Sequence, residues 1–271
     1  MSEIVNPLKI LFGLFSNRVL INQLAKREIT SRYKGTYLGV IWSYLYPLLM
    51  LSVYTFVFSE IFQSRWSSGV NNKVEFAMVL FCGLTTFNVF SEVLTKSPTL
   101  ITQNVNYVKK VVFPLEVLPV VSVLASLFNA LISYIILIVG LYFFLGVLNW
   151  TIIFTPIVLM PLIIVTAGLS WFLASLGVFI RDMGQLLVIL MQALMLLSPI
   201  FYPPTAIPES FRFLLNFNPL SYVIENMRKI MIWGELPNWQ YLLTGTLISV
   251  IIFVCGYAWF QKTKVGFADV L

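Results

Sequence analysis

The stretch "LAKREITSRYKGTYLGVIWSYLYPLLM", residues 24–50, changes from a basic polar pattern to an apolar one within a few positions. Between Leu20 and Lys34, polar and apolar residues each recur every three or four positions, which predicts an amphipathic helix. Gly35 follows at the position where a glycine commonly ends a helix. A basic amphipathic helix beside a membrane span lies in the lipid headgroup layer. This stretch therefore predicts an interface helix that leads into a transmembrane helix.

The whole chain has the composition of a membrane protein. It is 59% hydrophobic and only 10% charged, whereas charged residues make up about 25% of a soluble domain. A membrane-spanning helix needs about 20 mostly apolar residues, and the sequence predicts six such spans. They are residues 38–62, 76–95, 117–146, 152–180, 185–202 and 241–260. We therefore expect an all-α integral membrane protein, with a cytoplasmic N-terminus at 1–37 and a six-span domain at 38–271.

The positive charges predict how the chain is oriented. Most of the 17 Lys and Arg residues fall in alternate connecting segments, beginning with the segment before the first predicted span. Positive residues gather on the cytoplasmic side of membrane proteins, so both termini are predicted to be cytoplasmic. An even number of spans requires the same arrangement. The chain has no His and therefore no Cys/His cluster, which argues against a zinc site.

The basic residues of the predicted interface helix allow two interpretations. They are Lys26, Arg27, Arg32 and Lys34. In the first interpretation they anchor the helix by attracting anionic lipid headgroups. In the second they meet a diphosphate-bearing lipid substrate or a cytoplasmic partner. This stretch alone does not choose between the two.

Two segments between predicted spans are candidates for contact with a cytoplasmic partner. Residues 96–116 are too polar to cross a membrane, and Pro114 stops any helix that forms around Lys109 and Lys110. A short amphipathic element there is suited to dock in a groove on another protein, with a turn on the lipid surface as the alternative. The second segment, "FIRDMGQ", contains Arg181 and Asp182 and predicts a tight polar turn, in which Asp182 complements the dipole at a helix N-terminus.

The segment 203–240 is predicted to re-enter the membrane on the other side. In "NPLSYVIENMRKIMIWG", Asn218 occupies an N-cap position, Pro219 the first helical position and Gly234 the end. Irregular backbone at membrane depth must be buried in protein or line a cavity, and the proline-rich stretch "SPIFYPPTAIP" supplies such a break. We expect short re-entrant helices that form an outer gate, with an interfacial lid that only packs as the alternative.

The first predicted span carries aromatic residues along its depth. Aromatic faces stack on the C–H faces of sugar rings, so Trp42, Tyr44, Tyr46, Tyr54 and Phe58 suit a route for a sugar polymer. The alternative is that these side chains face lipid or the protein core.

Several kinds of chemistry are poorly supported by the sequence. The acidic residues of the spans lie near span ends, for example Glu92 and Glu116, whereas ion-coupled carriers usually need carboxylates inside the membrane. No glycine-rich phosphate loop ending in Gly-Lys-Ser/Thr is present. If ATP drives this protein, another chain binds it.

Four motifs together resemble one known family. They are "REITSRYKGTYLGVIWSYLYPLL", "YVKKVVFPLE", "FIRDMGQLL" with "LSPIFYPPTAIPE", and "NPLSYVIENMRKIM". They occur in order over essentially the whole chain, and the sequence resembles the permease subunits of ABC transporters that export polysaccharides such as O-antigen, capsule and teichoic acid. The resemblance implies a homodimer of permeases with two separate ATP-binding subunits, in which the first and fifth spans line a glycan channel.

The resemblance also implies roles for particular residues. The basic residues of the interface helix would lie near the lipid diphosphate. The coupling contacts to the ATPase subunit would involve Asn104, Tyr107, Lys109, Lys110, Arg181 and Asp182. The extracytoplasmic gate would involve Phe201, Tyr202, Phe211, Tyr222, Glu225 and Arg228.

The function expected from this resemblance is ATP-driven export of an undecaprenyl-diphosphate-linked polysaccharide such as O-antigen, a step of lipopolysaccharide biosynthesis, across the bacterial inner membrane. The chain itself is expected to be a permease and not an enzyme. It is expected to bind no cofactor, metal or nucleic acid, with ATP and magnesium on the partner subunit. The rival functions are an ABC permease for a small molecule or lipid, and a membrane-embedded glycosyl or acyl transferase.

Overall fold

The computed structural model describes residues 7–57, 73–109, 113–211, 215 and 218–271. In these residues the structure is helical and contains no strand, which confirms the predicted all-α class. The helices are α1 Pro7–Ser16, α2 Arg18–Tyr33, α3 Trp42–Thr55, α4 Lys73–Lys96, α5 Val105–Val108, α6 Val117–Gly140, α7 Thr155–Phe179, α8 Met183–Leu197, α10 Pro219–Arg228, α11 Trp239–Thr263 and α12 Phe267–Val270.

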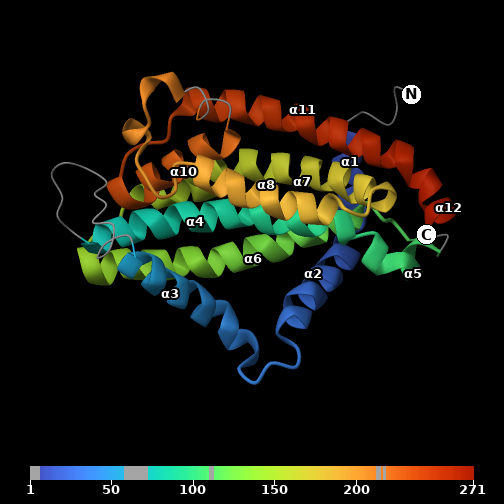
Figure 1. Cartoon of the computed structure of the whole chain (residues 1–271), viewed down its shortest axis with the longest axis horizontal. Helices are drawn as coiled ribbons and strands as arrows, with labels where there is room; N and C mark the ends of the chain where they lie inside the picture. Colours follow the sequence, from blue (N-terminus) through green and yellow to red (C-terminus); the bar gives the residue numbers. More distant parts are fainter. Residues whose placement is uncertain (1–6, 58–72, 110–112, 212–214, 216–217) are drawn as a thin grey trace.

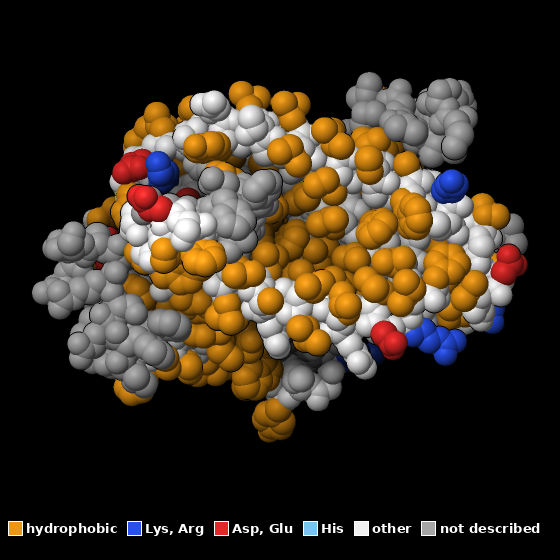
Figure 2. All heavy atoms as spheres, turned by 45° about the horizontal axis from the view of Figure 1, so that its top comes forward, with side chains coloured by type: hydrophobic (Ala, Val, Ile, Leu, Met, Phe, Trp, Pro, Cys, Tyr) orange, Lys and Arg blue, Asp and Glu red, His pale blue; other side chains and the backbone are white. Residues whose placement is uncertain are grey.

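Four helical segments of the described chain are long and apolar enough to cross a membrane. They are Val74–Thr99, Val117–Leu145, Trp150–Phe179 and Trp239–Val270, and they correspond to the predicted second, third, fourth and sixth spans. Figure 2 shows the matching surface pattern, with charged side chains gathered toward the two ends of the molecule and apolar side chains between them. The described chain is therefore a helical membrane protein with several apolar helices.

The predicted first and fifth spans are shorter than expected among the described residues. The first begins with a 3-10 turn at Gly39–Ile41 and continues as the 14 residues of α3, and residues 58–62 of the prediction lie outside the described chain. The fifth was predicted to reach residue 202, but α8 has 15 residues, about 22 Å at 1.5 Å per residue. It ends before Ser198, whose backbone is extended, because the residue that precedes a proline disfavours helical geometry. The predicted count of six spans is therefore not established.

Helix α4 lies at the centre of the bundle. It packs against α3, α6, α7, α8 and α10, and it is the most enclosed of the four long helices. Its apolar side chains, among them Leu80 and Phe87, belong to the largest buried cluster of the described chain. By contrast, α11 packs mainly along α7, and most of its surface is not covered by the rest of the chain.

Helices α7 and α11 approach closely through glycine. A Cβ atom added to Gly256 would collide with the backbone carbonyl of Gly168, and one added to Gly168 would collide with the backbone of Phe253. Small residues at such positions let membrane helices pack backbone to backbone.

Helices α2 and α3 extend away from the bundle and are joined by a loop at the lower edge of Figure 1, so that together they form a V. Their junction contains Gly35 with φ 87° and Gly39 with φ 52°, a left-handed region that suits glycine. Gly35 follows α2 as the sequence predicted. Helix α2 packs on α6, and α3 packs mainly on α4.

The two ends of the described chain lie at the same end of the bundle. Helices α1, α5 and α12 gather there in Figure 1, and Ile10 and Phe267 belong to one buried apolar cluster. The connection between α8 and α10 lies at the opposite end. This arrangement places the predicted partner-binding segments and the predicted gate at opposite ends of the apolar helices.

Candidate functional site

A pocket lined by both polar and apolar side chains lies where the end of α2 and the start of α3 face α4 and α6. Its volume is about 510 Å³ and it opens to the outside. The side chains that line it include Arg32, Trp42, Tyr46, Asn88, Glu92, Asn129 and Ser133. The pocket thus brings together one predicted interface residue and two predicted channel aromatics with polar residues of two apolar helices.

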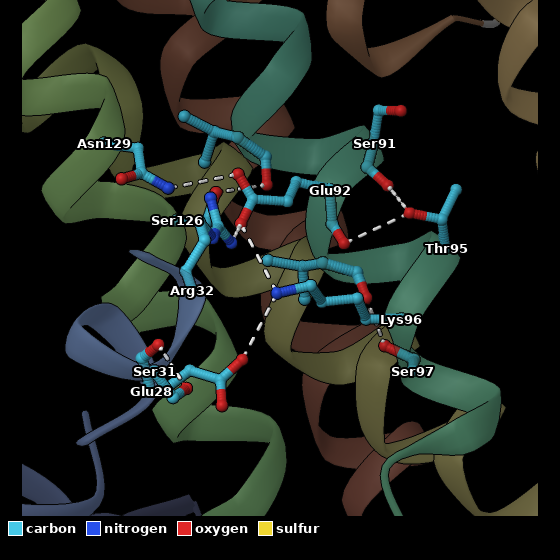
Figure 3. Close-up of polar contacts among 12 residues, drawn as sticks. Glu28, Ser31, Arg32, Ser91, Glu92, Thr95, Lys96, Ser97, Ser126 and Asn129 are labelled. Carbon is cyan, nitrogen blue, oxygen red and sulfur yellow. Dashed lines mark hydrogen bonds and ion pairs between the residues drawn. The ribbon is translucent and has the colours of Figure 1, made fainter. Parts of the chain in front are cut away.

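Glu92 is the centre of the charged network in this pocket (Figure 3). Its carboxylate accepts a hydrogen bond from the Arg32 guanidinium, and its second oxygen lies 3.4 Å from the Asn129 amide nitrogen. Lys96, one turn further along α4, lies 3.9 Å from Glu92 and donates a 3.2 Å bond to Glu28 of α2. The negative charges of Glu28 and Glu92 are therefore balanced by the positive charges of Arg32 and Lys96, and these ion pairs hold the end of α2 on α4.

Helical spacing explains why the polar side chains face each other. Asn88 and Glu92 are four residues apart on α4, and Asn129 and Ser133 are four residues apart on α6, so each pair occupies one helix face. The two helices run antiparallel, because Ser126 bonds to the Val89 carbonyl at 3.1 Å while Tyr134, further along α6, bonds to Thr86, earlier on α4, at 2.9 Å. This pairing sets Asn129 opposite Glu92.

The aromatic residues of α3 are divided between different surroundings. Trp42 and Tyr46 line the pocket, whereas Tyr44 is not among the lining residues. Tyr54, near the other end of α3, lies against Phe201, with ring centroids 6.1 Å apart. The structure thus joins a predicted channel residue to a predicted gate residue. Phe58 lies outside the described residues.

The predicted interface helix is present as α2, but its four basic residues are in different situations. Arg32 is engaged with Glu92, and Arg27 donates a 3.1 Å hydrogen bond to the Tyr107 hydroxyl. Lys26 and Lys34 are exposed and have no side-chain partner within the described chain. Of the four predicted residues, Lys26 in α2 and Lys34 directly after it are therefore the cations open to an anionic group.

Part of the apolar face of α2 is covered by protein. Ile21 and Ala25 are buried and pack in one cluster with Val117 and Val121 of α6. The sequence predicted a helix lying in the headgroup layer, and the structure shows that this face is partly used for packing on the bundle.

The segment predicted to contact a partner forms a compact element at the end of the bundle. Tyr107 of α5 stacks on Phe113, with ring centroids 4.2 Å apart and planes inclined by 8°. The Asn104 amide donates a 2.9 Å bond to the Leu100 carbonyl, so it serves the local turn. Lys109 is exposed, and Lys110 lies outside the described residues.

The second predicted contact is the turn between α7 and α8. Arg181 and Asp182 are both exposed there. Asp182 precedes α8 at the N-cap position without a side-chain capping bond, so its contribution is limited to the helix dipole. Gly177, near the end of α7, meets the backbone of Pro98 so closely that a Cβ would collide with it. This contact places the turn at the same end of the bundle as α5.

Arg228 is the most enclosed charged side chain of the described gate segment, with 0% exposure. Its guanidinium donates to the carbonyls of Pro199 at 2.6 Å and Ile200 at 3.0 Å, and its Nε donates to the carbonyl of Val79 at 3.1 Å. Its charge is balanced by Glu225 at 2.7 Å. Arg228 therefore ties α10 to both α4 and the break after α8.

The other predicted gate features follow local sequence signals. Asn218 caps α10 by accepting a 3.0 Å bond from the Leu220 amide, and Gly234, with φ 69°, ends the π-turn Lys229–Trp233 that follows the helix. Both confirm the predicted boundaries of this element.

The predicted gate aromatics have separate contacts. Tyr202 donates a 2.7 Å bond to the Leu196 carbonyl, and burial raises the pKa of its hydroxyl. Tyr222 lies 4.9 Å from Tyr241 of α11, measured between ring centroids. Phe211 is 55% exposed in the 3-10 turn Glu209–Phe211.

The sequence interpretation did not assign the polar residues of α4 and α6 to a site. Glu92 was noted only as an acid near a span end. The available signal was the recurrence of polar residues every four positions in otherwise apolar helices, at Asn88, Glu92 and Lys96. That signal indicates a polar face on α4, but it does not reveal which other helix faces it.

The long apolar helices that surround this pocket define a multi-pass membrane protein. The chain belongs to the ABC-2 type transporter family, whose sequence profile matches residues 19–232. Members of this family are transport permeases rather than enzymes. The matched segment runs from α2 into the turn Lys229–Trp233 that follows α10, and it includes every residue of the pocket.

Individual relatives are similar over nearly their whole lengths. The chain is 27% identical over 255 residues to the O-antigen export system permease protein RfbA of Klebsiella pneumoniae, covering 93% of this chain and 95% of the relative. It is 27% identical over 259 residues to the protein of the same name from Myxococcus xanthus, covering 94% and 96%. The polysialic acid transport protein KpsM of Escherichia coli is 26% identical over 260 residues, covering 90% and 95%.

Proposed function

We propose that this chain is the transmembrane subunit of an ATP-driven exporter of a lipid-linked polysaccharide, such as O-antigen on undecaprenyl diphosphate, across the bacterial cytoplasmic membrane. The observation that carries the proposal is the similarity, over more than nine-tenths of the chain, to permeases named for O-antigen export. A relative named for transport of a sialic acid polymer supports the same class of cargo.

The ATPase is a separate subunit in this proposal. The chain lacks a glycine-rich phosphate loop, and membership in the ABC-2 type transporter family implies association with ATP-binding subunits. Two copies of the permease pair and rest on two such subunits. The contact involves α5 with Lys109 and the turn with Arg181 and Asp182, which are exposed at one end of the bundle. That end and both termini are cytoplasmic.

The route of the cargo follows from the charges and aromatics. Lys26 and Lys34 receive the lipid diphosphate, because among the four predicted basic residues they have no side-chain partner in the described chain. The sugars then pass along α3 and α8 of the paired permeases, and the segment around α10 opens on the far side. Closure of the ATPase subunits moves α5 and the α7–α8 turn and thereby opens the gates.

Deletion of the gene tests this function against its rivals. The proposal predicts that polymer synthesis continues and that lipid-linked polysaccharide accumulates in the cytoplasmic leaflet, with export restored by a plasmid copy. Loss of synthesis would instead favour a membrane-embedded glycosyl or acyl transferase. Normal surface polysaccharide would favour a permease for a small molecule or lipid.

A further inference from the structure

The pocket between α3, α4 and α6 has the size and composition of a ligand site. Its volume of about 510 Å³ falls within the range of about 300–1,000 Å³ that is typical of small-molecule pockets. One wall carries the rings of Trp42 and Tyr46, and the facing walls carry the amides of Asn88 and Asn129. Apolar walls with a few polar groups of fixed position are what a specific ligand site requires.

The charged groups of the pocket favour a ligand without charge. The Glu92 carboxylate is already engaged by Arg32 and Asn129, with Lys96 nearby. An anionic group that entered this space would have to displace Glu92 from Arg32 and leave a partly buried carboxylate without its strongest partner, which is costly. A neutral polyol would meet no such penalty.

Asn88 supplies the polar group that a ligand would satisfy. Its side chain is exposed to the pocket and makes no hydrogen bond within the described chain, although it lies in one of the apolar segments long enough to span the membrane. Leaving an amide unsatisfied in an apolar environment is unfavourable. Asn129 uses one donor toward Glu92, and an asparagine amide has two donors and an acceptor. Both amides can therefore bond to hydroxyl groups.

From this juxtaposition we infer that the pocket is a saccharide site, in which one uncharged sugar ring of the cargo stacks on Trp42 and Tyr46 and bonds through its hydroxyls to Asn88 and Asn129. The inference rests on the proposed function and makes it more specific. The site lies within one chain, between the end of α2 and the start of α3. Arg32 and Glu92 act as positioning residues, because they hold the end of α2 against α4 and thereby close one side of the pocket.

Saturation-transfer NMR on the full-length chain in nanodiscs tests this site. The probe is the short-chain fraction of the polysaccharide of the producing strain, released from its lipid carrier by mild acid. The wild-type chain is expected to transfer saturation to the sugar ring protons. The double variant Asn88→Leu with Asn129→Leu is expected to weaken binding about tenfold, since it removes hydrogen bonds while preserving side-chain volume. Trp42→Ala is expected to abolish the signal from the stacked ring.

Two controls make the result decisive. Asn22→Leu changes an exposed asparagine of α2 outside the pocket and is expected to leave binding unchanged. The variant Asn88→Gln keeps an amide and is expected to retain measurable binding, while the thermal unfolding temperature of each purified variant shows that the fold is intact.

The outcomes separate this inference from the proposed function. Absence of binding to the wild-type chain, or equal binding to the double leucine variant, would overturn the saccharide site. Binding of pyrophosphate that competes with the glycan and is lost in Arg32→Gln would overturn it in favour of an anion site. In each case, accumulation of lipid-linked polymer in the deletion strain would still support the proposed function. A normal amount of surface polysaccharide in the deletion strain would contradict the proposed function.

Discussion

Arg228 of α10 donates a 3.1 Å hydrogen bond from Nε to the carbonyl of Val79, 149 residues earlier in α4. The same guanidinium bonds to the carbonyls of Pro199 and Ile200 in the break that follows α8. One side chain therefore donates to two carbonyls of the irregular backbone that follows α8 and to one carbonyl of α4. It also links the proposed gate to the central helix of the bundle.

Replacing Arg228 by Met is expected to destabilise the protein strongly. The substitution leaves three buried carbonyls without their donor and Glu225 without its partner, and we expect the free energy of unfolding in detergent to fall by about 3–5 kcal/mol. The adjacent Lys229 is the matched control, because it pairs with Glu235, which is 58% exposed, and exposed pairs contribute at most about 1 kcal/mol. Equal stability of Arg228→Met and Lys229→Met would contradict the structural role assigned to Arg228.

Gly256→Ala is expected to separate α7 from α11. The new methyl group would collide with the Gly168 backbone, and overpacking of this kind costs about 1–3 kcal/mol. Gly245→Ala in the same helix has open space around the new Cβ, and alanine favours a helix over glycine by up to about 1 kcal/mol. Thermal unfolding should therefore move in opposite directions for the two variants. A gain in stability for Gly256→Ala would show that the helices are not in this close contact.

Arg32 and Glu92 are expected to be energetically coupled. Their side chains are 29% and 24% exposed, so screening by solvent is less complete than for a fully exposed pair. A double-mutant cycle of Arg32→Met and Glu92→Gln, measured by denaturant unfolding, should give a coupling energy of about 1–2 kcal/mol. The cycle of Lys229 and Glu235 should give a smaller value. Additive effects at Arg32 and Glu92 would mean that α2 is not held on α4 by this pair.

Charge reversal at Lys109 and Arg181 is expected to weaken assembly with the ATPase subunit. Each exposed charge is worth up to about 1 kcal/mol, so the double variant to Glu should lower affinity for the ATPase subunit about tenfold. Affinity is measured with purified permease and its ATPase partner at low ionic strength. Lys229 directly follows α10, which lies toward the opposite end of the bundle in Figure 1, so Lys229→Glu should leave assembly unchanged. Assembly and ATPase stimulation equal to wild type in the double variant would exclude these residues from the contact.

Features set by neighbouring residues could be predicted from the sequence. The end of α2 at Gly35, the cap at Asn218 and the end at Gly234 all follow from residues within a few positions of one another. The long apolar runs likewise predicted four segments that the structure contains as helices.

Features set by contacts between distant segments could not be predicted in the same way. The pocket requires that Asn129 of α6 face Glu92 of α4, and the burial of Arg228 depends on carbonyls from two other segments. A periodic pattern indicates which side of a helix is polar, but it does not identify the helix that packs against that side. The shortness of α8 reflects Pro199, which ends the helix although the apolar composition continues beyond it.

Reconstitution tests the central claim most directly. Permease and ATPase subunit are placed in proteoliposomes that contain the lipid-linked polysaccharide, with ATP added on the side of the ATPase. The account predicts that ATP moves glycan to the lumen, where it becomes protected from an added glycosidase, and that a hydrolysis-deficient ATPase abolishes this protection. A protected fraction that does not increase with ATP, although the assembled complex hydrolyses ATP, would contradict the account.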